Sequence, residues 1–381
     1  MRAAQKPIAS ASGLPNAAYD DPELFEFERD HLFAKTWAGL EFASALPENA
    51  YARPVDFMGL PLLIIRDKGG QIRVFHNVCS HRGMILVTDA GPLRNFVVCP
   101  YHSWSYNQQG DLQSTPHIGG VGVNSAPGFS RQGNGLKEIR SAEWMGILFI
   151  NLSGDAIDFD EFIAPLAERW EAFTGPDAFA RLKVADSHGS LELKVKSNWK
   201  LAMENYCEAY HLPWVHPGLN TYSPLDQHVN LQVNDYMSGQ GSLNYQFLAV
   251  EGQSLPKFRA WPEDKNTVGE YISLFPNIML GLQVDHSFAL IAQPKACDQS
   301  LEKLQLFYVN DEAVSDAMHN CRKAVLDAWE IVFREDIFAI ERMQQGRKSQ
   351  GFTGGVFSPV MDTASHVFHK WVAKRYEDAL S

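Results

Sequence analysis

Two short cysteine–histidine motifs constrain the fold of this chain more than any other feature. The first is Cys79-Ser-His81, and the second, Cys99-Pro-Tyr-His102, begins after a gap of seventeen residues. Together they offer two thiolates and two imidazoles. Zinc also binds such sets, but in zinc fingers the two cysteines usually lie close together and the histidines follow. The paired spacing instead favours a two-iron, two-sulfur cluster in which one iron binds both cysteines and the other binds both histidines.

Imidazole ligands would change the redox properties of such a cluster. Neutral imidazoles in place of thiolates reduce its negative charge, which raises its reduction potential. The spacing, and the Ser103-Trp104 pair that follows the second motif, favour the cluster. A small zinc site, or core histidines beside buried thiols, remains the alternative interpretation.

A second group of candidate metal ligands lies about a hundred residues further along the chain, and it contains Asn205, Glu208, His211 and His216. On a helix, Glu208 and His211 would share one face, because residues three apart are neighbours. Pro213 would end or bend that helix, so that His216 could approach His211 from another direction. Two histidines and one carboxylate on one side of Fe(II) form the facial triad of non-haem oxygenases. Either histidine alone would more often be an ordinary polar residue.

A candidate for the carboxylate ligand lies near the end of the chain. Residues 324–345 carry apolar side chains at helical spacing, which predicts a long amphipathic helix. Glu335 and Asp336 lie within this pattern, and an acid that faces a core is costly unless it is paired or binds a metal. Adjacent residues point in different directions on a helix, so we expect only one of the two to face inward. Spacing alone does not choose between them, and both acids could simply be solvated.

With these motifs in this order, the chain resembles the α subunit of a Rieske non-haem iron oxygenase, the aromatic-ring-hydroxylating dioxygenase family. The resemblance extends over nearly the whole chain, in the family's order of N-terminal arm, Rieske domain and catalytic domain. It implies that the four residues of the two cysteine–histidine motifs hold a Rieske [2Fe–2S] cluster. It also implies an enzyme that uses O2 and electrons derived from NAD(P)H.

The resemblance also implies a mononuclear Fe(II) that activates O2 with electrons from the cluster. In the family, the third iron ligand is an aspartate on the C-terminal helix, followed some residues later by glutamine. Asp336 is followed by Gln344 and Gln345. The resemblance therefore assigns Asp336, rather than its neighbour, as the ligand that joins His211 and His216.

Glu208 departs from most of the family, which has aspartate at this position. In the family this carboxylate bridges a cluster histidine of one subunit and an iron histidine of the next. The resemblance therefore implies a head-to-tail ring, usually a homo-trimer, in which His102 of one chain faces Glu208 and His211 of its neighbour. Glutamate here resembles the subgroup that acts on choline, carnitine and betaines. Asn205 would be an outer or weak ligand, although a polar residue near a helix start explains it equally well.

The subgroup suggests a small quaternary ammonium or betaine-like substrate. A trimethylammonium group would lie against aromatic faces through cation–π attraction. Hydroxylation of a C–H next to nitrogen would then give an N-demethylated amine and formaldehyde, or an oxidised alcohol. The main alternative is hydroxylation or demethylation of an aromatic compound, which would stack on the same side chains. The candidate pocket residues, each of which is more often a core residue, are Tyr206, Trp214, Tyr271, Phe275 and Phe288.

The electron source is expected to be a separate protein. No convincing Gly-x-Gly-x-x-Gly follows a predicted strand, and no plant-type ferredoxin run of cysteines is present. We therefore expect a separate NAD(P)H-dependent reductase as partner. Two other functions fit part of the ligand set. A non-catalytic Rieske electron carrier would not need the second group of ligands, and a zinc hydrolase would leave the first cysteine–histidine motif without a purpose.

The composition of the chain indicates its cellular compartment and excludes some classes of partner. The formal net charge of −12 argues against nucleic acid or an anionic membrane as a partner. The N-terminus has no apolar core of a signal peptide, and the most apolar stretch is too short to span a bilayer. Five cysteines without a disulfide framework favour the reducing cytoplasm.

The pattern of elements predicts an α+β fold in three parts: an N-terminal arm over 1–36, a β-rich Rieske domain over 37–153 and a catalytic domain over 154–381. We expect the arm to pack with the catalytic domain, whose antiparallel sheet would be covered by helices. Two glycines, Gly69 and Gly70, predict a hairpin within residues 62–76. Elsewhere the sequence predicts helices over 22–33, 159–173, 324–345 and 364–378, and strands over 185–195, 271–275, 288–293 and 303–309.

Overall fold

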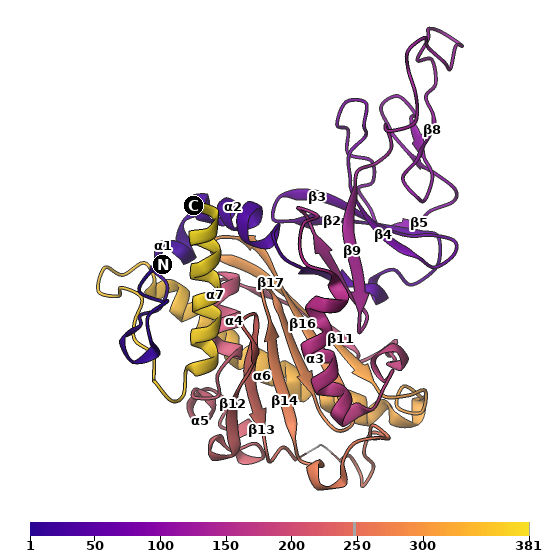
Figure 1. Ribbon diagram of the computed structural model, residues 1–381. Coiled ribbons are helices and arrows are strands. Elements are labelled where there is room, and N and C mark those ends of the chain that lie inside the picture. Colours follow the sequence, from indigo (N-terminus) through magenta and orange to yellow (C-terminus); the bar gives the residue numbers. More distant parts are fainter. Residues whose placement is uncertain (247–248, 381) are drawn as a thin grey trace. The chain divides into compact units, whose positions relative to one another are not determined.

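The computed structural model describes residues 1–246 and 249–380, and the chain forms two compact units. The smaller unit is Leu40–Gly154. The larger combines Met1–Gly39 with the chain from Asp155 onwards, so the N-terminal arm belongs to it. The smaller unit is rich in strands and the larger has a sheet with helices (Figure 1), which confirms the predicted α+β class.

The smaller unit contains a seven-stranded sheet of order β1-β10-β9-β4-β3-β2-β5 and a three-stranded sheet of order β6-β7-β8. The predicted hairpin is confirmed, since β3 and β4 are antiparallel neighbours and the turn between them uses Gly70 at φ 87°. The strands are β1 (Ala38–Phe42), β2 (Tyr51–Phe57), β3 (Leu60–Arg66), β4 (Ile72–His76), β5 (Gly91–Pro92), β6 (Val97–Val98), β7 (Ser105–Tyr106), β8 (Leu112–Ser114), β9 (Glu138–Trp144) and β10 (Ile147–Asn151), with a short helix η3 (Ala43–Ala45).

The larger unit is organised around a seven-stranded sheet of order β11-β17-β16-β15-β14-β13-β12. Every neighbouring pair is antiparallel, as predicted. The strand predicted over 185–195 begins only at Ser190, because the chain bends at His188, which has φ 55°. The strands are β11 (Ser190–Val195), β12 (His228–Asn234), β13 (Met237–Ser242), β14 (Gly269–Leu274), β15 (Ile278–Leu282), β16 (His286–Ala296) and β17 (Gln299–Tyr308).

Helices of the larger unit lie on both faces of this sheet. Side chains on β14 alternate between the faces. Glu270 binds Arg169 of α3 on one face, whereas Tyr271 contacts Tyr206 of α4 on the other. The helices are α1 (Ala17–Asp20), α2 (Pro22–Glu28), α3 (Phe159–Thr174), α4 (Trp199–Tyr206), α5 (Leu212–Val215), α6 (His319–Gly346) and α7 (Thr363–Leu380).

The predicted helices correspond closely to α3, α6 and α7, whereas the helix predicted over 22–33 is α2 followed by a π-helical turn. The short helical turns are η1 (Ile8–Ser10), η2 (Arg29–Phe33), η4 (Phe179–Arg181), η5 (Leu219–Thr221), η6 (Leu225–Gln227), η7 (Glu263–Lys265) and η8 (Asp316–Met318). Within residues 1–246 and 249–380, no helix has the length and apolar character needed to cross a membrane.

One row of side chains crosses the sheet on the face that carries α4. Gln240 of β13 pairs with Tyr271 of β14, which pairs with Gly281 of β15, which pairs with Phe288 of β16. A β-carbon at Gly281 would lie 2.2 Å from the Phe288 ring. Glycine is therefore required there, because the Phe288 ring lies over the backbone of the neighbouring strand. This row forms an aromatic and polar surface beneath the helices.

Candidate metal and substrate site

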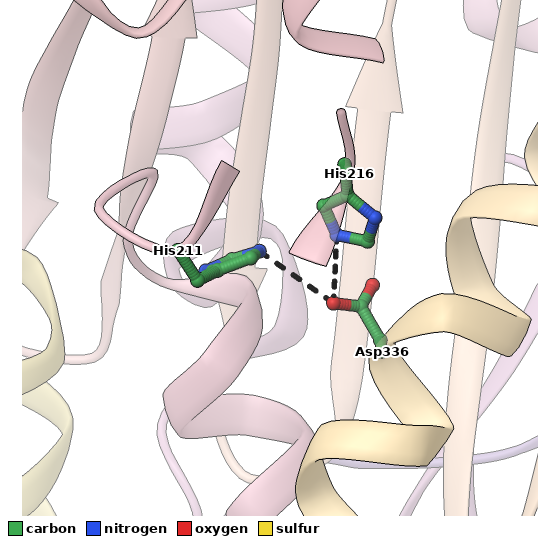
Figure 2. A group of neighbouring side chains, drawn as sticks. All are labelled: His211, His216 and Asp336. Carbon is green, nitrogen blue, oxygen red and sulfur yellow. Dashed lines mark hydrogen bonds and ion pairs between the residues drawn. The ribbon is translucent and has the colours of Figure 1, made fainter. Parts of the chain in front are cut away.

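Three side chains that the sequence assigns to iron lie together in the larger unit (Figure 2). One ligand atom each from His211, His216 and Asp336 lies within 4.8 Å of the other two. Asp336 Oδ1 is 2.9 Å from His216 Nε2 and 3.5 Å from His211 Nε2. Within the part of the chain that the structure describes, this is the only such group of three or more acidic, cysteine or histidine side chains. Two imidazoles and one carboxylate are the donors of a facial triad, so these residues could hold Fe(II).

The helix predicted to carry both Glu208 and His211 does not form. Helix α4 ends at Tyr206, and Glu208 lies in the link before the short helix α5. Pro213 does not end a helix but occupies the first turn of α5, where the missing N–H of proline costs nothing. Glu208 still reaches His211, because its Oε2 accepts a hydrogen bond of 3.2 Å from the His211 backbone N–H. The contact is therefore made by the link and not by a shared helix face.

Each of the two histidines has a carboxylate on the ring nitrogen that faces away from Asp336. Glu208 Oε1 is 2.6 Å from His211 Nδ1, and Glu335 Oε2 is 2.8 Å from His216 Nδ1. Such a carboxylate fixes a proton on Nδ1 and leaves Nε2 available for a metal. The expectation that only one of Glu335 and Asp336 would face inward is wrong, because the two acids reach His216 from opposite sides of its ring.

The charge around His216 favours a cation. Burial lowers the pKa of His216, but the hydrogen bonds and charges of Asp336 and Glu335 outweigh burial, so that its pKa is raised overall. The same negative charge would attract a divalent metal ion. The electrostatics of this cluster therefore agree with its donor set.

The triad faces a cavity with about 440 Å³ of empty space, a figure that includes solvent at its open mouth. Its aromatic lining consists of Tyr206, Tyr271, Trp329 and Phe333. Its polar lining, apart from the triad, consists of Asn205, Ser223, His228 and Gln240. Among the described residues that line it, none is lysine or arginine. The cavity therefore combines a candidate metal site with aromatic faces and neutral polar groups.

Helix α6 supplies one wall of the cavity. Trp329, Phe333 and Asp336 lie on one face because they are separated by four and three residues. The Trp329 indole N–H donates a 2.9 Å hydrogen bond to His286 Nε2, and Asp285 Oδ1 lies 2.7 Å from the other ring nitrogen of His286. This buried chain of hydrogen bonds fixes the plane of the indole.

The five predicted pocket residues occupy different positions. Tyr206 and Tyr271 line the cavity. Phe288 packs against Trp329, with ring centroids 4.4 Å apart. The other two lie elsewhere: the Trp214 side chain is 72% exposed on α5, and Phe275 is buried against aromatic rings of α7. Trp214 was a candidate because it is near motif residues in sequence, and Phe275 because it lies on a predicted strand. Neither property determines the direction of a side chain.

Asn205 lies at the cavity beside the triad. Its Nδ2 is 3.5 Å from His211 Nδ1, the same ring atom that Glu208 contacts. The amide is therefore close enough to influence the orientation of His211.

Several cavity residues were not identified from the sequence. Trp329 and Phe333 could have been found, because they lie seven and three residues before Asp336 on a predicted amphipathic helix. Ser223, His228 and Gln240 carried no such signal. They lie in and before the polar strands β12 and β13, which the sequence pattern does not predict.

In the smaller unit, the two cysteine–histidine motifs occupy two similar loops. Cys79 and Cys99 are buried in one apolar cluster, whereas His81 and His102 are exposed, with ring centroids 4.9 Å apart. Each cysteine carbonyl accepts a hydrogen bond from the backbone N–H four residues later, at 2.9 and 3.0 Å. The thiols thus face the interior and the imidazoles face solvent.

The spacing of these four side chains does not suit one zinc ion. Within the described residues, no three of them bring their ligand atoms within 4.8 Å of one another. Tetrahedral zinc holds its ligands at about 2.0–2.3 Å and would draw them closer together. Ligands spread over a larger volume fit a cluster of two irons, with the thiolates on the inner iron and the imidazoles on the outer one.

Tyr106 completes the cysteine side of this site. Its hydroxyl is 3.1 Å from Cys79 Sγ and accepts a 3.0 Å hydrogen bond from the Ser80 backbone N–H. Burial, followed by the hydrogen bond to Cys79, raises the pKa of Tyr106 to about 12. The phenol therefore stays protonated and can donate to a cluster sulfur ligand.

Comparison with known families agrees with both sites. Residues 36–127 match the Rieske [2Fe-2S] domain family. Residues 182–378 match the family described as the ring hydroxylating alpha subunit (catalytic domain), and this match covers just over half of the chain.

Individual relatives cover nearly the whole chain. The carnitine monooxygenase oxygenase subunit of Acinetobacter baumannii is 27% identical over 345 residues, which are 89% of this chain and 86% of that protein. The chloroplastic choline monooxygenase of Arabidopsis thaliana is 26% identical over 385 residues, covering 95% and 82%. The crystal structure of a quaternary ammonium Rieske monooxygenase in complex with an inhibitor has the same fold, with a TM-score of 0.78, 23% identity and coverage of 98% and 97%.

The family matches and the shared fold agree with the two sites described above. The protein is an oxygenase with a Rieske [2Fe–2S] cluster and a mononuclear iron. The chain belongs to the ring-hydroxylating α subunits, the catalytic components of the Rieske non-haem iron oxygenases.

Proposed function

We propose that this oxygenase uses O2 to hydroxylate or oxidatively N-demethylate a small quaternary ammonium or betaine-like compound. The observation that carries this proposal is the composition of one cavity. It places a facial-triad donor set beside four aromatic side chains, and its described lining contains no lysine or arginine.

The metal ligands are part of the proposal. We assign Fe(II) to His211, His216 and Asp336, whose ligand atoms already lie within 4.8 Å of one another. The bound iron supplies the site at which O2 is activated with electrons from the cluster. Glu208 and Glu335 hold the outer nitrogens of the two imidazoles, which keeps Nε2 of each ring directed at the metal.

The aromatic side chains favour a cation because their own polar atoms are already paired. The Tyr206 hydroxyl donates a 2.8 Å hydrogen bond to the Leu280 carbonyl, and the Trp329 N–H donates to His286. The ring faces, rather than the polar atoms, are left for the ligand. A desolvated ammonium over such a face gains about 2 kcal/mol or more. The names of the carnitine and choline monooxygenases among the relatives support the same substrate class.

An aromatic substrate is the second candidate, since the same four rings could stack on a planar ligand. The two candidates differ in charge. A quaternary ammonium ion would benefit from a described lining without lysine or arginine and with Glu335 and Glu208 nearby. An aromatic acid would bring its carboxylate into that same negative environment. The charge of the site therefore favours the ammonium compound.

Electron delivery completes the proposed function. We assign the [2Fe–2S] cluster to Cys79, His81, Cys99 and His102, and its reduction to a separate NAD(P)H-dependent reductase. We further propose a head-to-tail homo-trimer in which Glu208 links His211 to a cluster histidine of the neighbouring subunit. We place the enzyme in the cytoplasm, which is supported by five cysteines, none of which forms a disulfide within the described residues.

Electron paramagnetic resonance of the anaerobic Fe(II)–nitric oxide adduct tests the substrate class without a reductase. One panel of compounds contains choline, carnitine and betaines, and the other contains aromatic acids and amines. We expect a change of line shape with members of the first panel, because they bind beside the iron. A change only with the second panel would overturn the ammonium proposal. Asp336→Ala serves as the control, since it should abolish the signal of the mononuclear adduct with every compound.

A further inference from the structure

The link of residues 207–211 between α4 and α5 carries both Glu208 and His211, yet it has no regular secondary structure. The last of its backbone N–H groups that donates to α4 is that of Glu208, and this hydrogen bond to the Asn205 carbonyl is long, at 3.4 Å. Helix α4 therefore does not fix the direction of the Glu208 side chain. That direction depends on contacts between the link and the rest of the larger unit.

One side chain of the sheet holds the backbone of this link. Gln240 of β13 donates a hydrogen bond of 3.1 Å from Nε2 to the Glu208 carbonyl. Among the described residues, no other side chain of the sheet hydrogen-bonds to the backbone of the link. Gln240 is buried, and β13 is paired along both edges, with β12 and with β14. The link is therefore attached to a strand that is itself held on both sides.

The amide of Gln240 can adopt only one orientation. The Glu208 carbonyl can only accept, so the amide nitrogen must face it. The amide oxygen Oε1 then lies 2.6 Å from His228 Nδ1, which must donate to it. The other ring nitrogen of His228 lies 2.9 Å from Oγ of Ser223, a buried residue. The amide is therefore held at both of its ends, and it fixes the position of the Glu208 backbone.

The other end of Glu208 is held by His211. Oε1 of the carboxylate is 2.6 Å from His211 Nδ1, and Oε2 accepts a hydrogen bond from the His211 backbone N–H. The Glu208 side chain is still 15% exposed, and a carboxylate has about four lone-pair sites, so it can accept a further hydrogen bond. Because its carbonyl and its carboxylate are both held, Glu208 offers this further site in one direction.

We propose that Gln240 is a positioning residue for electron transfer between subunits. Through its bond to the Glu208 carbonyl, it keeps the Glu208 carboxylate in contact with both His211 and a cluster histidine of the neighbouring subunit. Without that bond, the carbonyl would lose its donor and the link would adopt other conformations, in only some of which the carboxylate reaches the neighbour. The inference rests on the proposed function, since it assumes the head-to-tail ring.

The reduction potential of the cluster tests this inference and requires neither a substrate nor the reductase. In the proposed ring, the Glu208 carboxylate lies beside an imidazole ligand of the neighbour's cluster, where its negative charge disfavours the reduced, more negative state. Glu208→Gln should therefore raise the midpoint potential. Gln240→Met, which removes both polar atoms of the amide, should raise it by a smaller amount. A redox titration followed by electron paramagnetic resonance of the reduced cluster, on rings verified by native mass spectrometry, measures both shifts.

The double variant distinguishes positioning from a general structural effect. If Gln240 acts only through the Glu208 carboxylate, adding Gln240→Met to Glu208→Gln should cause no further shift of the potential. A role of Gln240 that is independent of Glu208 would instead add its full shift in the double variant.

Gln305→Met is the matched control. Gln305 is a buried glutamine on β17 of the same sheet, its Nε2 donates a 2.7 Å hydrogen bond to the Gly189 carbonyl, and it is absent from the described lining of the cavity. This substitution should leave the potential unchanged. Gln240→Asn is a second variant in case Gln240→Met does not fold, because its amide is one methylene too short to reach the Glu208 carbonyl. It should also raise the potential.

The possible outcomes separate this inference from the proposed function. If Glu208→Gln raises the potential but the Gln240 variants do not, or if the two shifts add in full, Gln240 does not position Glu208 and the ring stands. If Glu208→Gln itself leaves the potential unchanged in intact rings, the carboxylate does not lie beside the neighbour's cluster. The proposed link between subunits is then wrong, and the inference falls with it.

Discussion

Glu335 supplies no ligand in the proposed iron site, yet it contacts a residue that does. Its Oε2 is 2.8 Å from His216 Nδ1, on the side of the ring opposite Asp336. A neutral amide would hold the ring N–H less strongly and make Nε2 a weaker donor to the metal. We expect Glu335→Gln to weaken Fe(II) binding by about 10–100-fold, as is typical of carboxylates behind a metal-binding histidine. Competition with an Fe(II) chelator measures this affinity.

Glu330 provides the control for that experiment. It lies on the same helix but pairs with Arg334 at the surface. Glu330→Gln should bind Fe(II) like the unchanged protein. Equal affinities for Glu335→Gln and Glu330→Gln would show that Glu335 does not support His216.

Tyr106 should tune the reduction potential of the cluster. Its protonated hydroxyl lies 3.1 Å from Cys79 Sγ, and hydrogen bonds to cluster sulfur ligands stabilise the reduced, more negative state. Tyr106→Phe removes that bond and keeps the buried ring. We expect the midpoint potential to fall by about 60 mV, the equivalent of one hydrogen bond of about 1.4 kcal/mol for a one-electron couple.

Protein-film voltammetry measures this shift directly. Tyr101→Phe is a suitable control, because Tyr101 is exposed in the same loop region and no hydrogen bond of its hydroxyl to Cys79 is present among the described contacts. A potential that is the same in Tyr106→Phe and in the unchanged protein would exclude a role for the Tyr106 hydroxyl.

At the scale of elements, the N-terminal arm is joined to the catalytic helices by a buried charge. Glu28, the last residue of α2, accepts hydrogen bonds from Lys200 Nζ (2.5 Å), Trp199 Nε1 (3.0 Å) and the Tyr376 hydroxyl (2.6 Å). Both Glu28 and Lys200 are almost completely buried. Three elements, α2, α4 and α7, thus converge on one carboxylate.

Removing this charge should destabilise the larger unit. Glu28→Gln would leave the buried Lys200 ammonium without its hydrogen-bonded counter-charge, a change that typically costs about 3–5 kcal/mol. We expect the melting temperature to fall by roughly 10 °C. Differential scanning calorimetry measures it, with the exposed Glu26→Gln on the same helix as the control. A melting temperature equal to that of the control would mean that Lys200 does not depend on Glu28.

The success of sequence-based prediction varied between elements for physical reasons. Helix α6 was predicted because its apolar residues recur at helical spacing, but this pattern did not choose between Glu335 and Asp336, and the choice of Asp336 came from the family resemblance. Strands β12 and β13 were missed because β13 consists of Met-Ser-Gly-Gln-Gly-Ser and has no apolar alternation. Gly239 is required there, since a β-carbon would lie 2.0 Å from the Tyr271 carbonyl oxygen. A hydropathy pattern does not indicate where two backbones approach each other closely.

The link between α4 and α5 shows a second limit of prediction from the sequence. The spacing of Glu208 and His211 fits a helix, but the helix ends at Tyr206 and the contact is made by a turn. Residue types and order were sufficient to predict that His211, His216 and Asp336 lie together. The local backbone depended on tertiary contacts of the link, such as the bond from Gln240 to the Glu208 carbonyl, which sequence spacing does not reveal.

At the scale of the whole molecule, the order of motifs predicted two metal centres, and each lies within its own compact unit. The structure of either compact unit alone does not determine how the subunits assemble. The proposed head-to-tail ring makes a prediction about mixtures of subunits. Cys99→Ser should remove the cluster and keep the iron site, whereas Asp336→Ala should remove the iron and keep the cluster.

Neither variant should turn over by itself, because each lacks one of the two centres. In a mixed ring, the cluster of an Asp336→Ala subunit can face the iron of a Cys99→Ser neighbour. Random mixing of equal amounts should restore about a quarter of the native turnover. An active head-to-tail interface needs the Cys99→Ser subunit on its iron side and the Asp336→Ala subunit on its cluster side, and about one interface in four has this arrangement. Co-expression followed by turnover with the reductase and the substrate measures this recovery. Its absence in verified mixed rings would exclude transfer between subunits.

The position of Glu208 in the mixture identifies its role. Glu208 contacts the proposed iron ligand His211 of its own chain, so in the proposed ring it can serve only the subunit that carries iron. Glu208→Gln in the Cys99→Ser subunit should therefore abolish the restored turnover while its iron content stays normal. The same substitution in the Asp336→Ala subunit should leave the restored turnover unchanged, because that subunit has no iron to receive an electron. Equal effects in both positions would mean that Glu208 supports assembly and does not link the two centres.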